Sequence, residues 1–352
     1  MSDFFETYKL NSEYGPVMVI AEIGVNHNGD LDRAKKMVLK ANQIGANAVK
    51  FQMFRPEALA TAKAEMWDSG YGPGQQLDML RKLALSPEEF TDLKRFTDQV
   101  GIEFLASVFD HDSLRHLVEL GVRAVKLGSC EITNEPLLTA AAKTGLPILL
   151  STGASDLEET KRAVEVLREA GANAIVLMHC VSHYPATLDD ANVLAVKTLR
   201  KEFDYPIGYS DHTTGFSAVL GAVALGARVI EKHFTLSKYD IGPDHEASAD
   251  VDEFKDIVQK IRNLERALGH GVKKWAPSEE PTRRLARKSL VALEVIKKGT
   301  KLSRDIVAIK RPGTGVPPKY YKEIGNYTAA CDIEADETIT WDMLEKRMKD
   351  EV

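Results

Sequence analysis

Ile207-Gly208-Tyr209-Ser210-Asp211-His212 and Val229-Ile230-Glu231-Lys232-His233-Phe234 each read as a buried strand with a histidine where the strand opens into a loop. The stretch between them, 215–226, is rich in small apolar residues and predicts a helix. Two parallel strands joined by a helix end at the same edge of a sheet. We therefore expect His212 and His233 to face one common site.

The same strand–loop–helix unit recurs along most of the chain. Glycines at 45, 121, 171 and 226 stand where one predicted helix ends and the next strand begins, as expected for a left-handed C-terminal cap. Strands are expected at 17–23, 46–53, 102–107, 124–127, 147–151, 174–179, 206–209 and 228–232. Eight such units predict a (β/α)8 TIM barrel, and a doubly wound open sheet is the alternative.

Further helices are expected at 31–44, 134–143, 156–169 and 251–268, and another starts at the capping-box sequence Ser86-Pro87-Glu88-Glu89. The loop 54–85 is long for a barrel and contains a turn signal at 71–74, which predicts a functional lid or a disordered segment.

The C-terminal part of the chain has a different pattern. We expect a barrel domain over 1–272, a linker over 273–286 that contains Pro277 and Pro281, and a small β-rich domain over 287–352. Short strands are predicted there at 289–296, 305–310 and 331–333.

Composition narrows the class of protein. The 352 residues carry a formal net charge of −6 and a pI near 5.9, which argues against a nucleic-acid-binding protein. The cysteines Cys130, Cys180 and Cys331 are too few and too scattered for a disulfide framework or a zinc site. The first nine residues hold no apolar signal segment, so we expect a cytoplasmic protein.

Polar side chains crowd the ends of the predicted strands, where the active site of a TIM barrel lies. They are Glu22, Lys50, Gln52, Ser107, Lys126, Ser129, Glu131, Ser151, His179, Ser182, Tyr184, Ser210, His212, Lys232 and His233. A barrel that serves only as a scaffold does not need such a cluster.

Lys50 and Lys126 each follow an apolar run, and a buried lysine is costly unless an anion pairs with it. We interpret the two lysines as a clamp for a phosphate or a carboxylate. A Schiff-base lysine of a barrel aldolase is the second reading, and a salt bridge to Glu22 or Glu131 is the third.

His212 and His233 predict a metal site, because two imidazoles at neighbouring strand ends can hold one divalent ion. Few other soft ligands lie nearby in sequence, so we expect Mn²⁺ first, with Mg²⁺ or Co²⁺ as alternatives. The serines at the strand ends predict hydroxyl donors to phosphate oxygens. No Walker A sequence is present, which argues against a nucleotide.

Six motifs, in order along the chain, resemble the sialic acid synthase family, whose members make sialic, legionaminic and pseudaminic acids. The motifs are AEIGVNHNG (21–29), VKFQ (49–52), KLGSCE (126–131), STG (151–153), YSDHT (209–213) and EKHF (231–234). The tail, with RKSLV (287–291) and KRPG (310–313), resembles the antifreeze-like (SAF) domain of that family.

The resemblance implies a TIM barrel with a SAF domain that condenses phosphoenolpyruvate with an N-acetylated amino sugar in a domain-swapped homodimer. It implies His212 and His233 as metal ligands and Glu131 as the residue that handles the attacking water. Phosphoenolpyruvate would be held by Lys50, Ser107, Lys126, Ser129, Ser151 and Ser210. The sugar would be held by Glu22, Gln52, Tyr184, Asp244 and an Arg311 from the second copy, with Ser182 where the substrates meet.

Two positions differ from the pattern of the family. Ser107 stands where threonine is common, which is a mild change for a phosphate donor. Ser182 stands where sialic acid synthases typically carry asparagine, so the sugar stays open between N-acetylmannosamine and a diacetamido-dideoxy hexose. A Schiff-base aldolase and a non-catalytic sugar-binding protein are the alternative functions.

Overall fold

The structure is a computed structural model that describes residues 3–12, 15–65 and 75–347. It divides into two compact units, residues 1–270 and residues 271–352, and each unit is described by itself.

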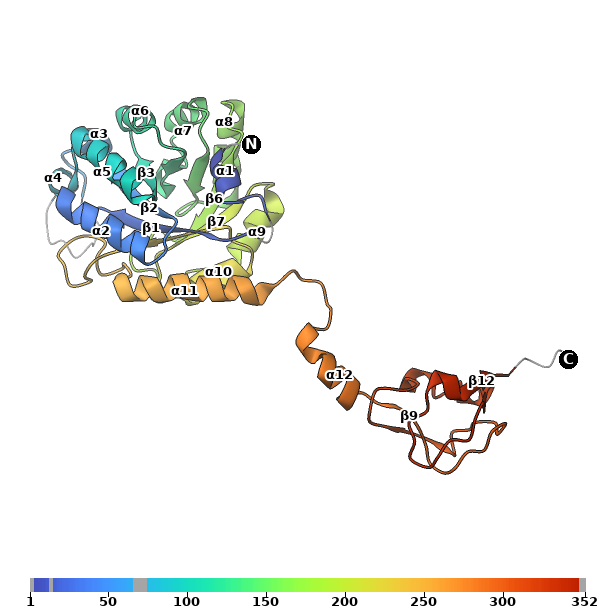
Figure 1. The fold of residues 1–352 in the computed structure, drawn as a ribbon. Coiled ribbons are helices and arrows are strands. Elements are labelled where there is room, and N and C mark those ends of the chain that lie inside the picture. Colours follow the sequence, from blue (N-terminus) through green and yellow to red (C-terminus); the bar gives the residue numbers. More distant parts are fainter. Residues whose placement is uncertain (1–2, 13–14, 66–74, 348–352) are drawn as a thin grey trace. The chain divides into compact units, whose positions relative to one another are not determined.

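The first unit is a closed barrel of parallel strands, as the sequence predicts (Figure 1). Each strand pairs with the next along the chain, and the last pairs with the first, which excludes the open sheet. The strands are β1 (Met18–Gly24), β2 (Ala48–Met53), β3 (Glu103–Val108), β4 (Val125–Leu127), β5 (Ile148–Ser151), β6 (Ile175–Cys180), β7 (Ile207–Asp211) and β8 (Val229–His233).

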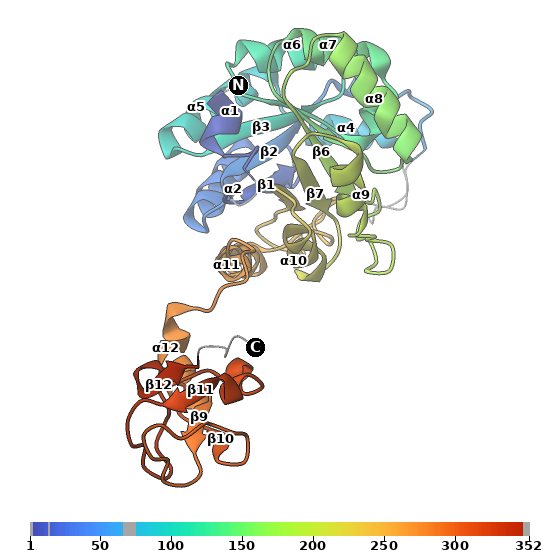
Figure 2. The ribbon, with the colours of Figure 1, turned by 90° about the vertical axis from the view of Figure 1, so that its right-hand side faces the viewer.

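Amphipathic helices surround the strands and bury their apolar faces against the outside of the barrel. They are α2 (Leu31–Gln43), α5 (Pro87–Val100), α6 (His111–Glu119), α7 (Glu135–Lys143), α8 (Leu157–Glu169), α9 (Ala195–Glu202), α10 (Ser217–Ala224) and α11 (Val251–Leu268). Figure 2 shows α6, α7 and α8 side by side on this outer layer. The capping box at Ser86 is present, and the four cap glycines have φ between 73° and 99°.

Alternation along the strands separates two layers of side chains. Outward-facing residues such as Val49 and Phe51 pack under the helices. Inward-facing residues at the N-terminal end of the barrel, such as Ile20 and Leu105, form a second apolar cluster. A short helix that the sequence did not predict, α1 (Asp3–Thr7), adds Phe4 and Phe5 to this cluster.

The long loop after β2 contains two helices, α3 (Pro56–Leu59) and α4 (Gln76–Leu83). An isolated antiparallel bridge joins Glu65 to Gln75. We call residues 54–65 and 75–85 the insert. It has a small apolar cluster of its own, centred on Phe54, Met79, Leu80 and Leu83. The predicted turn at 71–74 lies outside the described residues.

The second unit is a small β structure with its own core around Leu290, Val316 and Ile339. It contains α12 (Glu280–Ala286), β9 (Ser289–Ala292), β10 (Val307–Lys310), β11 (Tyr327–Ala329) and β12 (Leu344–Lys346). β9 pairs with β10 and β11 with β12, both antiparallel. The predicted strand 331–333 is wrong, because only an isolated bridge from Ile333 to Ile296 forms there.

Short 3-10 turns lie at Ser129–Glu131 in the barrel and at Pro277–Glu279, Pro318–Tyr320, Ile324–Asn326 and Trp341–Met343 in the second unit. Across the described ranges, no helix combines the length and the apolar character that a membrane span requires.

Candidate active site

A cavity of about 660 Å³ lies at the C-terminal ends of the barrel strands. Most of the predicted site residues line it, and the exceptions are Glu131, His179, Lys232 and Arg311. The lining includes Glu22, Lys50, Gln52, Ser107, Lys126, Ser129, Ser151, Ser182, Tyr184, Ser210, His212, His233 and Asp244. The sequence therefore identified side chains that the fold brings together from seven of the eight strands and the loops that follow them.

One side of the cavity carries a buried network of opposite charges. Lys50 on β2 lies 2.7 Å from Glu22 and 3.8 Å from Glu231, and its ammonium also donates to Ser107 at 2.8 Å. Burial raises the pKa of Glu22 to about 7, although Lys50 opposes this shift. Burial also disfavours charge on Glu231, but Lys50 and Lys126 outweigh it and hold the pKa of that carboxyl below its usual value.

Lys126 differs from Lys50 because it has no carboxylate in contact. Its ammonium donates to the Ser151 hydroxyl at 2.6 Å and to the Leu127 carbonyl at 3.0 Å, and only 2% of the residue is exposed. Across the described ranges no ion pair reaches it, and burial lowers its pKa. A buried cation beside hydroxyls is suited to bind an anion.

Ser129, Cys180 and Ser182 converge on the backbone of Gly153. The Gly153 amide donates to the Ser129 hydroxyl at 3.0 Å, and that hydroxyl lies 3.1 Å from the Cys180 sulfur. A Cβ on Gly153 would lie within 2.8 Å of all three side chains, so glycine is required for this approach. Burial raises the pKa of the Cys180 thiol, which keeps it protonated.

His212 and His233 face the same cavity, with ring centroids 5.5 Å apart. His212 Nδ1 lies 2.5 Å from the Val181 carbonyl and donates to it, which leaves the Nε2 lone pair free to ligate. His233 Nδ1 is buried without a hydrogen-bond partner and lies 3.7 Å from Asp244. Burial lowers both pKa values and favours the neutral imidazoles that bind metals.

The two imidazoles fit a divalent ion that keeps open positions for water or substrate. Among the described residues, no group of three or more His, Cys, Asp or Glu is placed to hold a metal. An ion at this place would therefore have two imidazole ligands, and Asp244 as a neighbouring carboxylate.

Three further predicted residues differ in where they lie. The Glu131 carboxylate accepts from Asn134 at 2.6 Å and is not among the described residues that line the cavity. Arg311 is exposed in the second unit. Tyr184 lies over the imidazole of His212 with ring centroids 4.2 Å apart, so it stands directly beside the proposed metal ligands.

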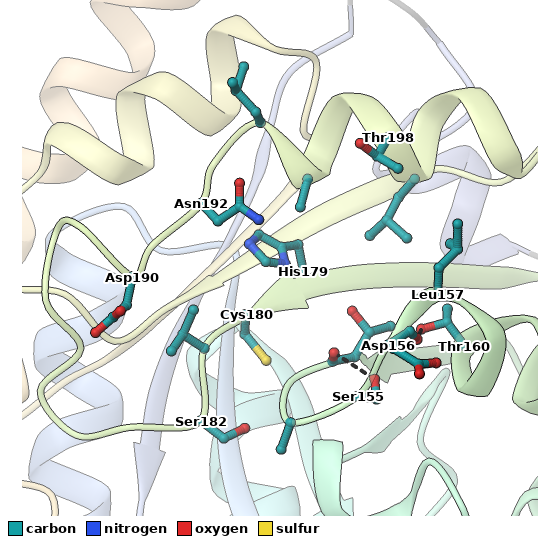
Figure 3. Close-up of a pocket in the computed structure, with 16 residues that line it drawn as sticks. Ser155, Asp156, Leu157, Thr160, His179, Cys180, Ser182, Asp190, Asn192 and Thr198 are labelled. Atoms are coloured by element: carbon teal, nitrogen blue, oxygen red, sulfur yellow. Dashed lines mark hydrogen bonds between the residues drawn. The ribbon is translucent and has the colours of Figure 1, made fainter.

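Two strand-end residues that the sequence grouped with the site point away from it, because neighbouring residues of a strand face opposite sides. Lys232 pairs with Asp211 at 2.5 Å outside the barrel, where both side chains are buried. His179 lines a second cavity of about 570 Å³ between β6, α8 and α9 and lies 3.0 Å from the Ala191 carbonyl (Figure 3).

Sequence reasoning missed two acidic residues. Glu231 lies in the wall of the cavity and accepts from Ser210 at 2.9 Å, and its place two residues before His233 could have revealed it. Asp211 receives the Tyr209 hydroxyl at 3.1 Å and the Thr213 hydroxyl at 2.8 Å, and so holds the end of β7 beside His212.

Comparison of the sequence with known protein families gives two matches. Residues 37–273 match the NeuB family, and residues 287–345 match the SAF domain. The chain belongs to the NeuB family of sialic acid synthases. As a member of the NeuB family, the protein is an enzyme, a transferase that forms carbon–carbon bonds.

Two relatives that are named for their activity match nearly the whole chain, and one solved structure matches about three quarters of it. The N,N'-diacetyllegionaminic acid synthase of Legionella pneumophila is 41% identical over 93% of this chain and 94% of its own. The human N-acetylneuraminate-9-phosphate synthase is 35% identical over 95% of this chain and 94% of its own. The N-acetylneuraminic acid synthetase of Leptospira borgpetersenii, solved with citrate, is 36% identical with a TM-score of 0.70 over 76% of this chain and 90% of that chain.

Proposed function

We propose that the protein condenses phosphoenolpyruvate with an unphosphorylated N-acetylated amino sugar in a metal-dependent reaction. The products would be a nine-carbon 2-keto acid of the sialic acid type and inorganic phosphate. The single observation that carries this proposal is Lys126, a buried ammonium that contacts Ser151 but no carboxylate. An anionic substrate would supply its missing counter-charge.

In this proposal phosphoenolpyruvate lies between Lys126 and Lys50. The hydroxyls of Ser107 and Ser151, which already accept from these ammonium groups, can turn to donate to phosphate or carboxylate oxygens. Ser129, fixed against Gly153, adds a third hydroxyl. Orientation and charge neutralisation are the main contributions of these residues.

His212 and His233 would hold the divalent ion, with Mn²⁺ expected first. When bound, the ion would act as a Lewis acid toward the aldehyde oxygen of the open-chain sugar. The protein residues orient that aldehyde toward C3 of phosphoenolpyruvate, whose attack forms the new carbon–carbon bond. The aldehyde oxygen takes up a proton and becomes a hydroxyl.

Water then adds to C2, where positive charge develops during the attack. A carboxylate accepts one proton of this water, which leaves a hydroxyl on C2. The C2–O bond to phosphate then breaks, the phosphate leaves with the bridging oxygen and takes up the hydroxyl proton, and the C2 ketone forms. Glu131 stays our prediction for this carboxylate. Glu22 is the second candidate, because it lines the cavity and its pKa of about 7 suits a general base near neutral pH.

For the sugar we favour a diacetamido deoxy hexose over N-acetylmannosamine. The legionaminic acid synthases of Legionella pneumophila and Campylobacter jejuni are both 41% identical to the chain, whereas the human N-acetylneuraminate-9-phosphate synthase is 35% identical. The serine at 182 points the same way, since it is smaller than the asparagine typical of sialic acid synthases.

Phosphate release tests this function directly. The enzyme with Mn²⁺, phosphoenolpyruvate and a panel of acetamido sugars should release phosphate, and mass spectrometry should find the nine-carbon acid. ¹⁸O in the bridging position of phosphoenolpyruvate should appear in phosphate, and label in the ketone would exclude the scheme. His212→Ala should lose metal-dependent turnover and Mn²⁺ binding in calorimetry while its unfolding temperature stays near wild type.

We further propose that the enzyme works as a homodimer in which Arg311 of a second copy contacts the sugar. The support is the SAF domain match and the exposure of Arg311 in the second unit. Mixing inactive Lys126→Met with inactive Arg311→Ala should restore part of the activity, because one mixed site would be intact. Equal inactivity of the mixture, with dimers present in solution, would contradict this.

A further inference from the structure

The cavity has one wall that the reaction described above does not use. Val25, Leu59, Met79, Leu80, Leu83 and Phe109 are its apolar lining residues, and Gln76 adds one polar side chain from α4. Four of the six apolar side chains come from the insert, that is, from residues 54–65 and 75–85. The lysines, serines and imidazoles that serve phosphoenolpyruvate and the metal come from other parts of the fold.

This apolar wall is a built feature. Met79, Leu80 and Leu83 on α4 pack with Phe54 and Val25 into one buried cluster. Phe109 meets Phe54 edge to face with ring centroids 6.2 Å apart. At the end of α4, Gly29 approaches so closely that a Cβ on it would lie 2.4 Å from the Lys82 carbonyl, which fixes the helix against the barrel.

The insert brings no cation to the cavity. Among the described residues that line it, the basic side chains are Lys50, Lys126, His183, His212 and His233, and all of them come from strand ends or the loop after β6. A second phosphate, carried by the sugar, would have to leave water against hydrocarbon. A methyl group would instead gain from burial.

We propose that this apolar wall is a subsite for a methyl group of the sugar and selects unphosphorylated sugars that carry one. The group is either the C6 methyl of a deoxy sugar or the methyl of an acetamido group. This inference rests on the proposed function and names the insert as its specificity element. Leu80 and Met79 are the specificity-determining residues, because both line the cavity from α4.

The test uses two matched pairs of sugars that each exchange a methyl for a hydroxymethyl group. One pair is 6-deoxy-N-acetylmannosamine and N-acetylmannosamine, and the other is N-acetylmannosamine and its N-hydroxyacetyl analogue. At least one pair should show a 5- to 20-fold preference in kcat/KM for the methyl compound, since a methyl pocket discriminates against an added hydroxyl only modestly. N-acetylmannosamine 6-phosphate should be at least about 100-fold poorer.

Leu80→Asn and Met79→Gln change polarity with little change in size and should reduce the methyl preference toward one. Leu77→Asn is the matched control, because Leu77 is a buried residue of α4 that is not among the described residues lining the cavity. It should leave the ratio unchanged. The ratio of the two kcat/KM values compares two substrates on one enzyme preparation. It can therefore be measured even where a variant is partly unfolded.

Three results would overturn the proposal: a wild-type preference for neither methyl compound, equal use of the 6-phosphate, or an unchanged ratio in both α4 variants. Failure of the proposed function looks different, because no sugar would then cause phosphate release from phosphoenolpyruvate. If one of the two variants does not fold, the other still tests the proposal, since Leu80 and Met79 both line the cavity.

Discussion

The two ends of the barrel are built from the same strands but contain opposite kinds of side chain. Two residues along a strand return to the same face, so inward positions can be compared directly. Going from the N-terminal to the C-terminal end, Ile20 is followed by Glu22, Ala48 by Lys50, Leu105 by Ser107, Leu149 by Ser151 and Val229 by Glu231. Two residues span about 7 Å along a strand, and over this distance the inward side chain changes from apolar to charged or hydroxyl-bearing.

Stability and chemistry therefore depend on opposite ends of the barrel. The N-terminal end is closed by Phe4, Phe5 and Leu10, which pack on the inward apolar layer and keep water out. The C-terminal end holds buried charges that cost free energy until a substrate compensates them. We therefore expect substitutions at one end to change stability and those at the other to change activity.

Lys126→Met should give the largest effect on activity. Removal of one buried cation from the substrate site should reduce kcat/KM for phosphoenolpyruvate roughly 10³-fold, as the loss of an oxyanion donor does. Stability should stay within about 1 kcal/mol of wild type, because Lys126 has no carboxylate that would be left unpaired. Phosphate release and urea unfolding measure the two quantities.

Lys50→Met is the matched control for that substitution. Lys50 is 2.7 Å from Glu22, so its removal leaves a buried carboxylate and should lower stability as well as activity. Comparable losses of stability in the two lysine variants would contradict the distinction that we draw between a paired and an unpaired buried cation.

Lys232→Met breaks the simple contrast between the two ends, because this lysine is charged and lies near the active end, yet it faces outward. It should lower the free energy of unfolding by about 3–5 kcal/mol, since Asp211 would remain buried without its partner. The double variant with Asp211→Asn should recover part of that loss. Urea unfolding measures the free energy of unfolding of the single and double variants. If the loss in the double variant equals the sum of the losses in the two single variants, Lys232 and Asp211 are not coupled.

Much of this arrangement could be predicted from the sequence. Apolar runs, four of them preceded by glycine caps, predicted all eight strands to within a few residues. The polar residues at the strand ends and in the loops that follow predicted most of the polar lining of the cavity. The capping box at Ser86 likewise located the start of α5. These features are local, so the chain itself displays them.

Other features depend on contacts between distant segments. The helix α1 is too short for its apolar period to be recognised, and Phe4 is buried only because the end of the barrel is open to receive it. The outward direction of His179 and Lys232 followed from strand alternation, but only once the ends of β6 and β8 were known. The strands β11 and β12 are three residues each, which is below what a sequence pattern can reveal.

Phe4→Ala tests the apolar N-terminal end of the barrel. Phe4 is 1% exposed, packs edge to face on Tyr8 with ring centroids 5.0 Å apart, and lies under the Arg123 guanidinium at 5.8 Å. Truncation should therefore lower the free energy of unfolding by about 3 kcal/mol. KM for phosphoenolpyruvate and kcat should stay within about twofold of wild type at a temperature where the variant is folded, because the cavity at the C-terminal ends of the strands is lined by other residues. A large change in KM with little loss of stability would show that the apolar end also shapes the catalytic end, and the separation of the two would then be wrong.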